Sequence, residues 1–590
     1  MKEPFVRRAI AVGITTASPL LLGTVAQATP VCAVDIVCTG NVVIIPANER
    51  GDRLNVGLQS ADGSVRVEGG REVTLEAGTG VPAPGRGQNI IRPQVTFGDA
   101  FDGPVTGSLR VTGGGSMLAL RGDNTGAIVA GGIVSGGIGL LTVDDGGSLV
   151  LTDTSIVDDD PGVNRDVYLD TGQRGGEALV TVDGGTISLL SNSVAGIGLG
   201  TDGNGTGTMV VEGGGTVSVR STGAPDNNGF VDVAIGRNDG GNNVGRLEVR
   251  DGDVQLDAPN GGARLDFGQV GSRGTGLISG PDATVTLTGG PDFTIARVGT
   301  GAGAVGDLTV ENGGQLRVAG SGAVFSSGDQ RFGGIDPNTS VGRTTIRSGG
   351  EIVVEGTDFG IARLGDDEPD ASSASLATLL VEGAGSRFAA SDFIEIGADD
   401  GVGSTTAIAT INDGGSLDAP EIRVLGGGIL RGDGGVVNGD LVLGAGGLLA
   451  PGLSPGALTV SGDLFLGGGL LEIEIGGRAP GEFDRLEVLG SVFADDPFDL
   501  DISFIDGFLP EEGERFSFLS AGSFVGDFVD LAMVSISGLG GGASIALAAD
   551  EDGVIGFRTE NVAPIPLPAG LPLLLAAAAA LVGVGRVQRR

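Results

Sequence analysis

The segment Leu308-Thr309-Val310-Glu311-Asn312-Gly313-Gly314-Gln315-Leu316 decides the fold, because its pattern recurs along the chain. The pattern is a short β-branched run, an acidic residue or Asn, the pair Gly-Gly, and a second run of alternating apolar residues. Internal repetition of this kind is typical of a solenoid or another repeat array. Strong copies occupy residues 141–150, 180–187, 210–217, 345–352 and 409–417, and weaker copies occupy residues 65–76, 109–117, 247–256 and 379–388.

A second phrase, an apolar residue followed by Gly, occurs a similar number of residues before many of these copies. The two phrases alternate along the chain, so we expect each full period of the repeat to hold two rungs. Short strands with period-two alternation are separated by Gly, Asn and Asp, which supply corners with positive φ. The second phrase occurs at Ile197-Gly198, Ile235-Gly236, Val298-Gly299, Leu364-Gly365 and Ile396-Gly397.

Short strands without a long helical pattern could build a sandwich, an up-and-down barrel or a solenoid. The fixed repeat favours the solenoid, because one rung cannot bury its inward side chains whereas stacked rungs share a narrow core. The composition suits such a core: 115 of the 590 residues are Gly, aromatic residues make up 4%, and Trp is absent. We therefore predict an all-β right-handed parallel β-helix with a short β-rich C-terminal cap.

Charge and composition exclude several classes of function. The chain has 35 basic and 74 acidic residues, a formal net charge of −39, which repels nucleic acid and anionic lipid. It has no His, and Lys2 is its only lysine. These absences exclude Ser-His-Asp and Cys-His catalysis, His-ligated zinc or haem, and lysine-dependent Schiff-base or P-loop chemistry.

The N-terminal residues have the order expected of a secretory signal peptide. Lys2, Arg7 and Arg8 precede an apolar stretch at residues 9–25, and Ala26-Gln27-Ala28 has the small-x-small form of a cleavage site. We predict cleavage after Ala28, with an ordinary N-terminal helix as the alternative. Cys32 and Cys38, the only cysteines, follow at once. On an exported chain we expect them to form one disulfide, with two free thiols as the alternative.

The C-terminal residues also fall into three parts. Pro564-Ile565-Pro566-Leu567-Pro568-Ala569-Gly570 precedes an apolar run at residues 571–585, and Arg586, Arg589 and Arg590 follow it. With Ala569 and Gly570 the run approaches the lower length limit of a membrane-spanning helix. The arginines should stay on the cytoplasmic side, so we expect the body of the chain on the opposite side.

The tail resembles the VPLPA variety of the PEP-CTERM sorting signals. The match rests on Pro566-Leu567-Pro568-Ala569, the apolar run and the terminal arginines, with Ile565 in place of the usual Val. The resemblance implies an exported Gram-negative protein whose C-terminus is handled by an exosortase. A plain tail anchor is the alternative, and it implies the same topology without processing.

A second resemblance begins at Gly426 and extends to Val529. The core Ala450-Pro451-Gly452-Leu453-Ser454-Pro455-Gly456 resembles the passenger-associated transport repeat of autotransporter passengers. Residues 471–475, 483–488 and 513–529 resemble the closing rungs of such β-helices. Only the sorting tail remains after Val529. We therefore expect a passenger-type β-helix that is delivered by a route other than that of autotransporters.

These signals divide the chain into five parts. We expect a signal peptide at residues 1–28, parallel β-helix repeats at 29–425, and the transport repeat with closing rungs at 426–531. A β-rich tail and linker should follow at 532–563, and the sorting signal with its transmembrane segment at 564–590.

Two kinds of motif could carry binding chemistry. The acidic runs Asp158-Asp159-Asp160 and Asp366-Asp367-Glu368 could hold Ca²⁺. Their Gly- and Pro-containing flanks favour solvated loop charge, and the strict calcium-binding nonapeptide is absent. Arg-Gly-Asp occurs at residues 50–52, 121–123 and 431–433, which suggests integrin binding. Chance and the turn preference of Gly-Asp account for these triplets better than integrin binding does.

No catalytic, cofactor-binding or metal-binding residue stands out from the repeat, so we expect a non-enzymatic protein without a cofactor. The predicted function is that of an exported cell-surface or extracellular-matrix structural or adhesin-like rod, with roles in adhesion or biofilm packing. Its expected partners are the membrane, a sorting enzyme, and an extracellular polysaccharide or other surface. The alternative is a carbohydrate-active β-helix enzyme, a lyase or hydrolase. That enzyme should show clustered Asp and Arg that depart from the repeat, and a rod should show none.

Overall fold

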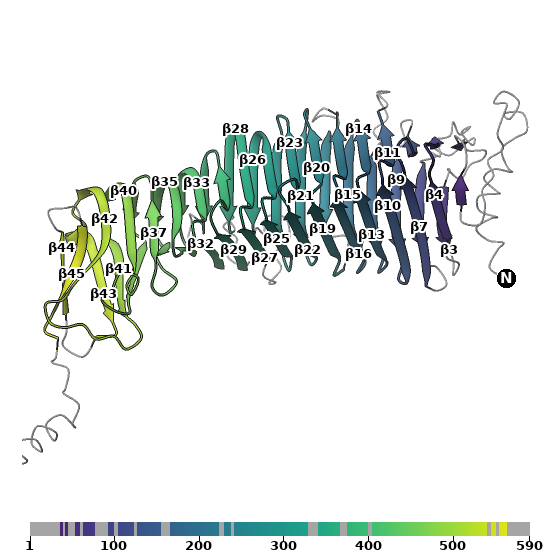
Figure 1. Cartoon of the computed structure of the whole chain (residues 1–590). Helices are drawn as coiled ribbons and strands as arrows, with labels where there is room; N and C mark the ends of the chain where they lie inside the picture. Colours follow the sequence, from purple (N-terminus) through teal and green to yellow (C-terminus); the bar gives the residue numbers. More distant parts are fainter. Residues whose placement is uncertain are drawn as a thin grey trace, which may run out of the picture.

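The structure, a computed structural model, is an elongated stack of β-strands that runs the length of the molecule (Figure 1). Its strands wind as successive coils, and each coil contributes strands to three faces around a common core. The described residues are 36–38, 42–44, 53–58, 63–76, 93–99, 104–122, 127–154, 166–223, 229–237, 241–328, 340–365, 374–398, 404–539, 544–549 and 554–562.

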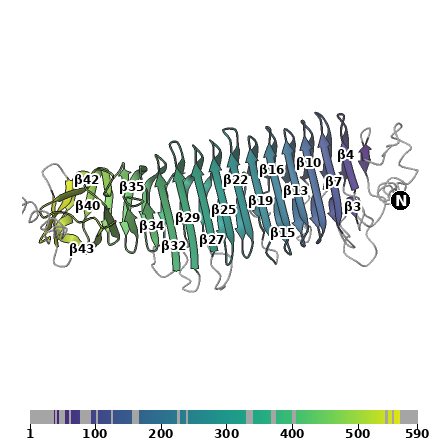
Figure 2. The same ribbon diagram turned by 60° about the horizontal axis from the view of Figure 1, so that its bottom comes forward.

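The first face is a parallel sheet of 17 strands, one from each coil, which lie side by side in Figure 2. Its strands are β1 (Ile36–Cys38), β4 (Gly63–Val67), β7 (Val105–Thr112), β10 (Gly137–Asp144), β13 (Glu177–Asp183), β16 (Thr206–Glu212), β19 (Val244–Arg250), β22 (Arg273–Ser279), β25 (Val305–Glu311), β27 (Ser340–Arg347), β29 (Ala374–Glu382), β32 (Ser404–Asn412), β34 (Gly428–Arg431), β36 (Leu448–Ala450), β39 (Leu470–Ile475), β41 (Phe498–Phe504) and β43 (Ala532–Ser537).

Together with a C-terminal hairpin, the second and third faces form one sheet of 28 strands, because several strands bend across the corner between the two faces. Second-face strands are β2 (Val42–Ile44), β5 (Glu72–Glu76), β8 (Met117–Arg121), β11 (Ser148–Asp153), β14 (Thr186–Ser191), β17 (Thr216–Ser221), β20 (Asp253–Ala258), β23 (Thr284–Gly289), β30 (Arg387–Ala390) and β37 (Ala457–Val460). Third-face strands are β3 (Arg53–Leu58), β6 (Gln94–Asp99), β9 (Ala127–Ile133), β12 (Val167–Gln173), β15 (Val194–Asp202), β18 (Phe230–Ile235), β21 (Gly262–Gln269), β24 (Phe293–Thr300), β31 (Phe393–Ile396) and β38 (Leu464–Gly467). Strands that serve both faces are β26 (Gln315–Ser327), β28 (Glu351–Leu364), β33 (Ser416–Val424), β35 (Gly435–Gly444), β40 (Arg485–Ala494) and β42 (Arg515–Gly526).

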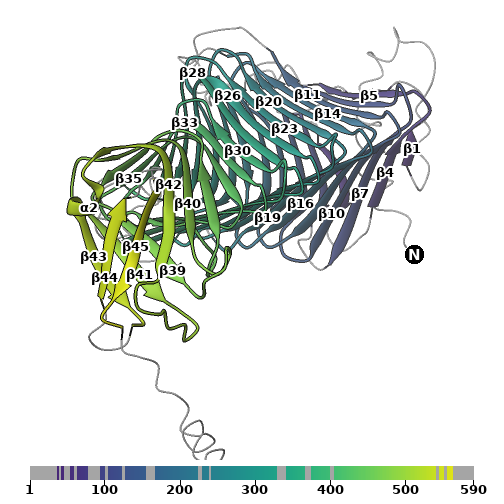
Figure 3. The ribbon, with the colours of Figure 1, turned by 60° about the vertical axis from the view of Figure 1, so that its left-hand side comes forward.

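The all-β prediction is confirmed, and the long parallel sheets agree with a β-helical solenoid. Figure 3 shows first-face strands such as β10 and second-face strands such as β14 on different sides of the rod. The expectation of two rungs per period is wrong. Each period is a single coil, and the two recurring phrases mark two different corners of that coil.

The coils shorten where the sequence changes at Gly426. In the middle of the rod Thr206 pairs with Val244, so one turn of the coil takes in the whole segment between these two residues. In the C-terminal part the pairs are much closer in sequence, since Ala407 pairs with Gly428 and Ile429 pairs with Leu448. The short coils extend from β32 to β39, and the later pairs Leu470 with Asp499 and Phe498 with Ala532 are again far apart in the sequence.

A continuous column of Val and Ile side chains lies inside the first face. Each member pairs in register with the next, and all are at most 1% exposed. β-branched side chains suit this position because they pack well on a pleated, buried surface. The column comprises Val67, Val111, Val143, Val182, Val211, Val249, Ile278, Val310, Ile346, Val381 and Ile411.

The Gly-Gly phrase forms the corner between the first and second faces. Asp145 and Gly146 take left-handed backbone conformations, with φ of 50° and 78°. Gly147 is required for space, because a Cβ there would lie 2.4 Å from the carbonyl oxygen of Val111 on the preceding coil. The two glycines of the phrase thus have different roles, one conformational and one steric. The same pattern recurs at residues 312–314 and 413–415.

The second phrase marks a different corner, where the third face leads into the first face of the next coil. Gly236 has a φ of +78°, and a Cβ there would lie 2.2 Å from the carbonyl oxygen of Arg273. The predicted copy Ile197-Gly198 lies within β15, where Gly198 pairs with Ala234, and Gly200 forms the corner instead. Most of the corner glycines combine positive φ with the same close approach to backbone. They are Gly98, Gly132, Gly172, Gly200, Gly268 and Gly299.

The C-terminal end of the stack departs from the coil pattern. β44 (Ser544–Ala549) and β45 (Val554–Glu560) form an antiparallel hairpin, and β45 pairs antiparallel with β42. A short helix, α2 (Phe528–Leu531), packs Phe528 against the last rungs. Within the described ranges, no helix combines the length and apolar character needed to cross a bilayer. The predicted transmembrane segment lies outside those ranges and stays a prediction.

Candidate functional site

The most distinctive chemistry lies on the outer side of the third face. In β21 (Gly262–Gln269) the side chains of Leu265 and Phe267 point into the core, so the alternating residues Arg264 and Asp266 point outward. Asp266 pairs in register with Arg297 on β24, and Arg264 pairs with Asp232 on β18. Charged groups from three successive coils therefore meet on one face. We call Asp232, Arg264, Asp266 and Arg297 the charged cluster.

Asp266 and Arg297 form a bidentate ion pair at the centre of the charged cluster. Arg297 Nε donates to Asp266 Oδ1 at 2.6 Å, and Nη2 donates to Oδ2 at 2.7 Å. Both side chains are buried, with 0% and 3% of their surface exposed. Burial favours the neutral acid, but the guanidinium of Arg297 and then that of Arg264 hold the pKa of Asp266 below its usual range.

The rest of the cluster is also paired. Arg264 donates to Asp232 Oδ1 through Nε at 3.0 Å and through Nη2 at 2.8 Å. Arg237 lies 3.8 Å from the other oxygen of Asp232, and Gln269 donates to Asp266 at 2.7 Å. Each carboxylate is thus neutralised by at least one guanidinium.

This cluster departs from the repeat, as we expected of an enzyme rather than of a rod. Its chemistry differs from that of a general acid and base, however, because both carboxylates are paired with arginines. The sequence signal was available. When the second phrase is aligned on its Gly, Asp232 and Arg264 lie four positions before Gly236 and Gly268, and Asp266 and Arg297 lie two positions before Gly268 and Gly299.

Asp484 connects the Pro-Gly core of the transport-repeat segment to the closing rungs. Its Oδ1 accepts the N–H of Gly456 at 2.8 Å, and its Oδ2 accepts the N–H of Glu474 at 2.8 Å. The side chain is 1% exposed. Burial raises the pKa of Asp484 to about 7; the two backbone N–H groups oppose this rise, and the charges of Glu474 and Glu472 add to it.

We expect Asp484 to make the stability of this region depend on pH. Its folded pKa of about 7 exceeds the ordinary value of 3.8, so the native state binds more protons between these values. The free energy of unfolding should fall as pH rises through this window, by up to about 1.4 kcal/mol per unit, and level off above pH 7. Chemical denaturation between pH 4 and 8 should show this slope in the native chain and a flatter one in Asp484→Asn.

The control for this experiment is Asp433→Asn. Asp433 is exposed, and its Oδ1 accepts the N–H of Ala457 at 3.1 Å in the same segment. This variant also loses one carboxylate that caps a backbone N–H, but it should keep the slope. A native chain whose stability rises between pH 4 and 7 would contradict the assignment.

The Arg-Gly-Asp triplet at residues 431–433 lies at a corner of the coil. Gly432 is buried, and a Cβ there would lie 1.9 Å from the carbonyl oxygen of Ile411. Arg431 Nε lies 3.3 Å from Thr410 Oγ1. The triplet therefore has a structural role in joining coils. The copy at residues 50–52 and the last residue of the copy at 121–123 are outside the described ranges.

Most of the sequence-predicted site residues lie outside the described part of the chain. These are the cleavage-site residues Ala26 and Ala28, Cys32 of the predicted disulfide, the acidic runs, and the sorting motif Pro566, Leu567, Pro568, Ala569 and Gly570. Cys38 falls in β1, but its side chain is not described. Within the described ranges, no group of three or more Cys, Asp or Glu side chains is placed to hold a metal ion.

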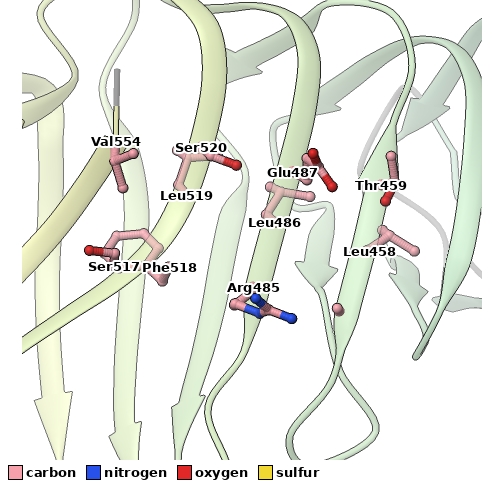
Figure 4. Close-up of a pocket in the computed structure, with 11 residues that line it drawn as sticks. Leu458, Thr459, Arg485, Leu486, Glu487, Ser517, Phe518, Leu519, Ser520 and Val554 are labelled. Carbon is pink, nitrogen blue, oxygen red and sulfur yellow. The ribbon is translucent and has the colours of Figure 1, made fainter. Parts of the chain in front are cut away.

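A surface pocket of ≈ 240 Å³ lies near the C-terminal end, between β37, β40, β42 and β45 (Figure 4). Arg485 and Glu487 line it together with Thr459 and Ser520. Arg485 and Glu487 are exposed residues of one strand, so their charges face solvent. Apolar side chains, among them Leu458, Leu486 and Phe518, also line the pocket, and its lining holds no buried nucleophile or base.

The chain was compared with known proteins by family and by sequence. No protein-family model matches it, and a search of curated proteins found no match.

Proposed function

We propose that this chain is an exported structural or adhesin-like rod of the cell surface or extracellular matrix, without enzymatic activity or a cofactor. The observation that carries the proposal is the continuous stack of 17 parallel first-face strands. A stack of this kind has long exposed sides around a core that is filled by side chains, which suits a spacer or an adhesive surface. The right-handed sense of the coil, which the usual crossover rule favours, belongs to the same proposal.

In this proposal the two ends of the chain direct its export and its sorting. Residues 1–28 act as the signal peptide, and Cys32 and Cys38 form a disulfide near the new N-terminus. Residues 564–590 act as the sorting signal, whose apolar run spans the membrane until a sorting enzyme processes it. The body then lies on the outer side of that membrane.

We expect a Pro566→Ala/Pro568→Ala variant to reach the membrane but to keep its tail. The changes alter the sorting motif and leave the apolar run intact. Mass spectrometry of the surface-exposed protein should show that the native chain begins after Ala28 and lacks residues beyond the motif, whereas the variant retains them. Pro564→Ala, two residues before the motif, is the matched control and should behave like the native chain. Equal processing of all three chains would contradict the sorting role.

The carbohydrate-active enzyme remains the alternative because the charged cluster departs from the repeat. Its carboxylates are paired with arginines, which opposes a role as acid and base. Release of reducing ends or unsaturated sugars from polysaccharides by the purified chain, lost in Asp232→Asn, would favour the enzyme over the rod.

A further inference from the structure

Apolar side chains gather on the outer side of the third face, next to the charged cluster. Phe230 on β18, Phe293 on β24 and Phe359 on β28 form one column. In the neighbouring column Ile295 pairs with Val324, Val324 with Ile361, and Ile361 with Phe393. Outward positions of a solvated sheet are ordinarily polar. We call these seven residues, Phe230, Phe293, Ile295, Val324, Phe359, Ile361 and Phe393, the aromatic strip.

Glycines between the phenylalanines make the aromatic surface continuous. Phe230 pairs with Gly262, and Gly322 pairs with both Phe293 and Phe359. A Cβ on Gly322 would lie 2.4 Å from the Phe359 ring, so that ring occupies the space above the glycine. The rings of Phe230 and Phe293 meet edge to face, with centroids 6.3 Å apart. Phe293 and Phe359 remain 51% and 41% exposed.

The strip follows the long axis of the rod. It spans six successive coils, five of which contribute its residues. Neighbouring strands are about 4.8 Å apart, so the strip is roughly 25 Å long. Only Phe293 and Phe359 of the strip are exposed and its other members are half-buried, so the strip is small beside the roughly 800 Å² that each partner of a stable protein interface buries. The shape therefore fits a narrow linear ligand better than a second copy of the chain.

The charges beside the strip select the chemistry of that ligand. Arg264 is paired with Asp232, Arg363 with Glu395 at 3.5 Å, and the Arg423 guanidinium lies 4.3 Å from the Phe393 ring centroid. These charges cancel locally, while the chain as a whole carries −39. An anionic polymer would be repelled, and a cation would find these carboxylates occupied. An uncharged, hydroxyl-bearing ligand suits apolar rings that are bordered by hydrogen-bonding groups.

We propose that the aromatic strip binds an uncharged, extended polysaccharide that lies along the rod. Sugar rings stack their C–H faces on Phe293 and Phe359, and hydroxyl groups reach the polar groups beside the strip. This inference deepens the proposed surface function by naming its ligand and the residues that bind it. Strand spacing makes every second coil recur at roughly 10 Å, which matches the disaccharide repeat of a β-1,4-linked chain.

Calorimetry on the full chain with cellohexaose and mannohexaose tests the proposal. We expect at least one of these oligosaccharides to bind, and Phe293→Ala and Phe359→Ala each to weaken binding roughly fivefold or more. Phe359→Tyr, which keeps the ring, should bind like the native chain. Ile138→Ala changes an exposed apolar residue of the first face, 40% exposed, and should leave binding unchanged.

Three results would overturn the proposal. They are no binding of either oligosaccharide, binding that survives the double variant Phe293→Ala/Phe359→Ala, and tighter binding of the anionic polymer alginate. A native dimer that becomes a monomer in the double variant would instead assign the strip to self-association. Because purified protein is used, these results are independent of whether the chain is sorted to the surface.

Discussion

Gly236→Ala should destabilise the coils around it by at least about 3 kcal/mol. Two costs add at this position. The backbone has a φ of +78°, which disfavours a residue with a Cβ by roughly 1–2 kcal/mol. The new Cβ would also lie 2.2 Å from the carbonyl oxygen of Arg273, so the backbone of the next coil must move.

Two other glycines separate these costs. Gly349 has a φ of +77° but nothing within 4 Å of an added Cβ, so Gly349→Ala should show only the conformational cost. Gly114 has neither positive φ nor a close neighbour, and Gly114→Ala should be nearly neutral. Hydrogen exchange is the suitable measurement, because a repeat protein can open locally. Exchange in β18, β21 and β22 should accelerate in Gly236→Ala, and similar protection in all three variants would contradict the steric argument.

These glycines show how far the sequence predicts the fold. The Gly-Gly phrase and the apolar-Gly phrase reveal the repeat, the strands and the corners, because each depends on local backbone geometry. The three-faced coil could not be derived in the same way. One corner, between the second and third faces, carries no fixed phrase, and single strands such as β26 bend across it. The sequence therefore suggested two rungs where one coil is formed.

The charged cluster and the aromatic strip were missed for a related reason. Their members are separated in the sequence by whole coils, and only the register of the third face places Asp266 beside Arg297 and Phe293 beside Phe230. Aromatic residues make up only 4% of the chain, and their grouping cannot be seen in the sequence. A few phenylalanines on one face are enough to form a continuous strip, because the coil concentrates them.

Asp266→Asn should cost about 3–5 kcal/mol, because it leaves the guanidinium of Arg297 buried without its carboxylate. The matched control is Asp307→Asn on the first face, where Asp307 lies 3.1 Å from Arg343 and both side chains are partly exposed. That pair should contribute less than about 1 kcal/mol. The loss in the free energy of unfolding is measured for each variant by chemical denaturation and by hydrogen exchange in β21 and β24. The difference between the two losses gives the effect of burial on an ion pair.

The direction of the pH dependence gives an independent check on the same pair. The folded pKa of Asp266 lies below the ordinary value of 3.8, so its stabilising contribution is complete above that pH and is lost as pH falls through the folded pKa. The native chain should therefore lose more stability on acidification than Asp266→Asn does. The double variant Asp266→Leu/Arg297→Met should recover most of the stability, since a well-packed apolar pair can replace a buried ion pair. If the double variant were as unstable as Asp266→Asn, the loss of stability would come from altered packing rather than from the unpaired charge. The cluster would then stabilise the rod through the packing of its side chains.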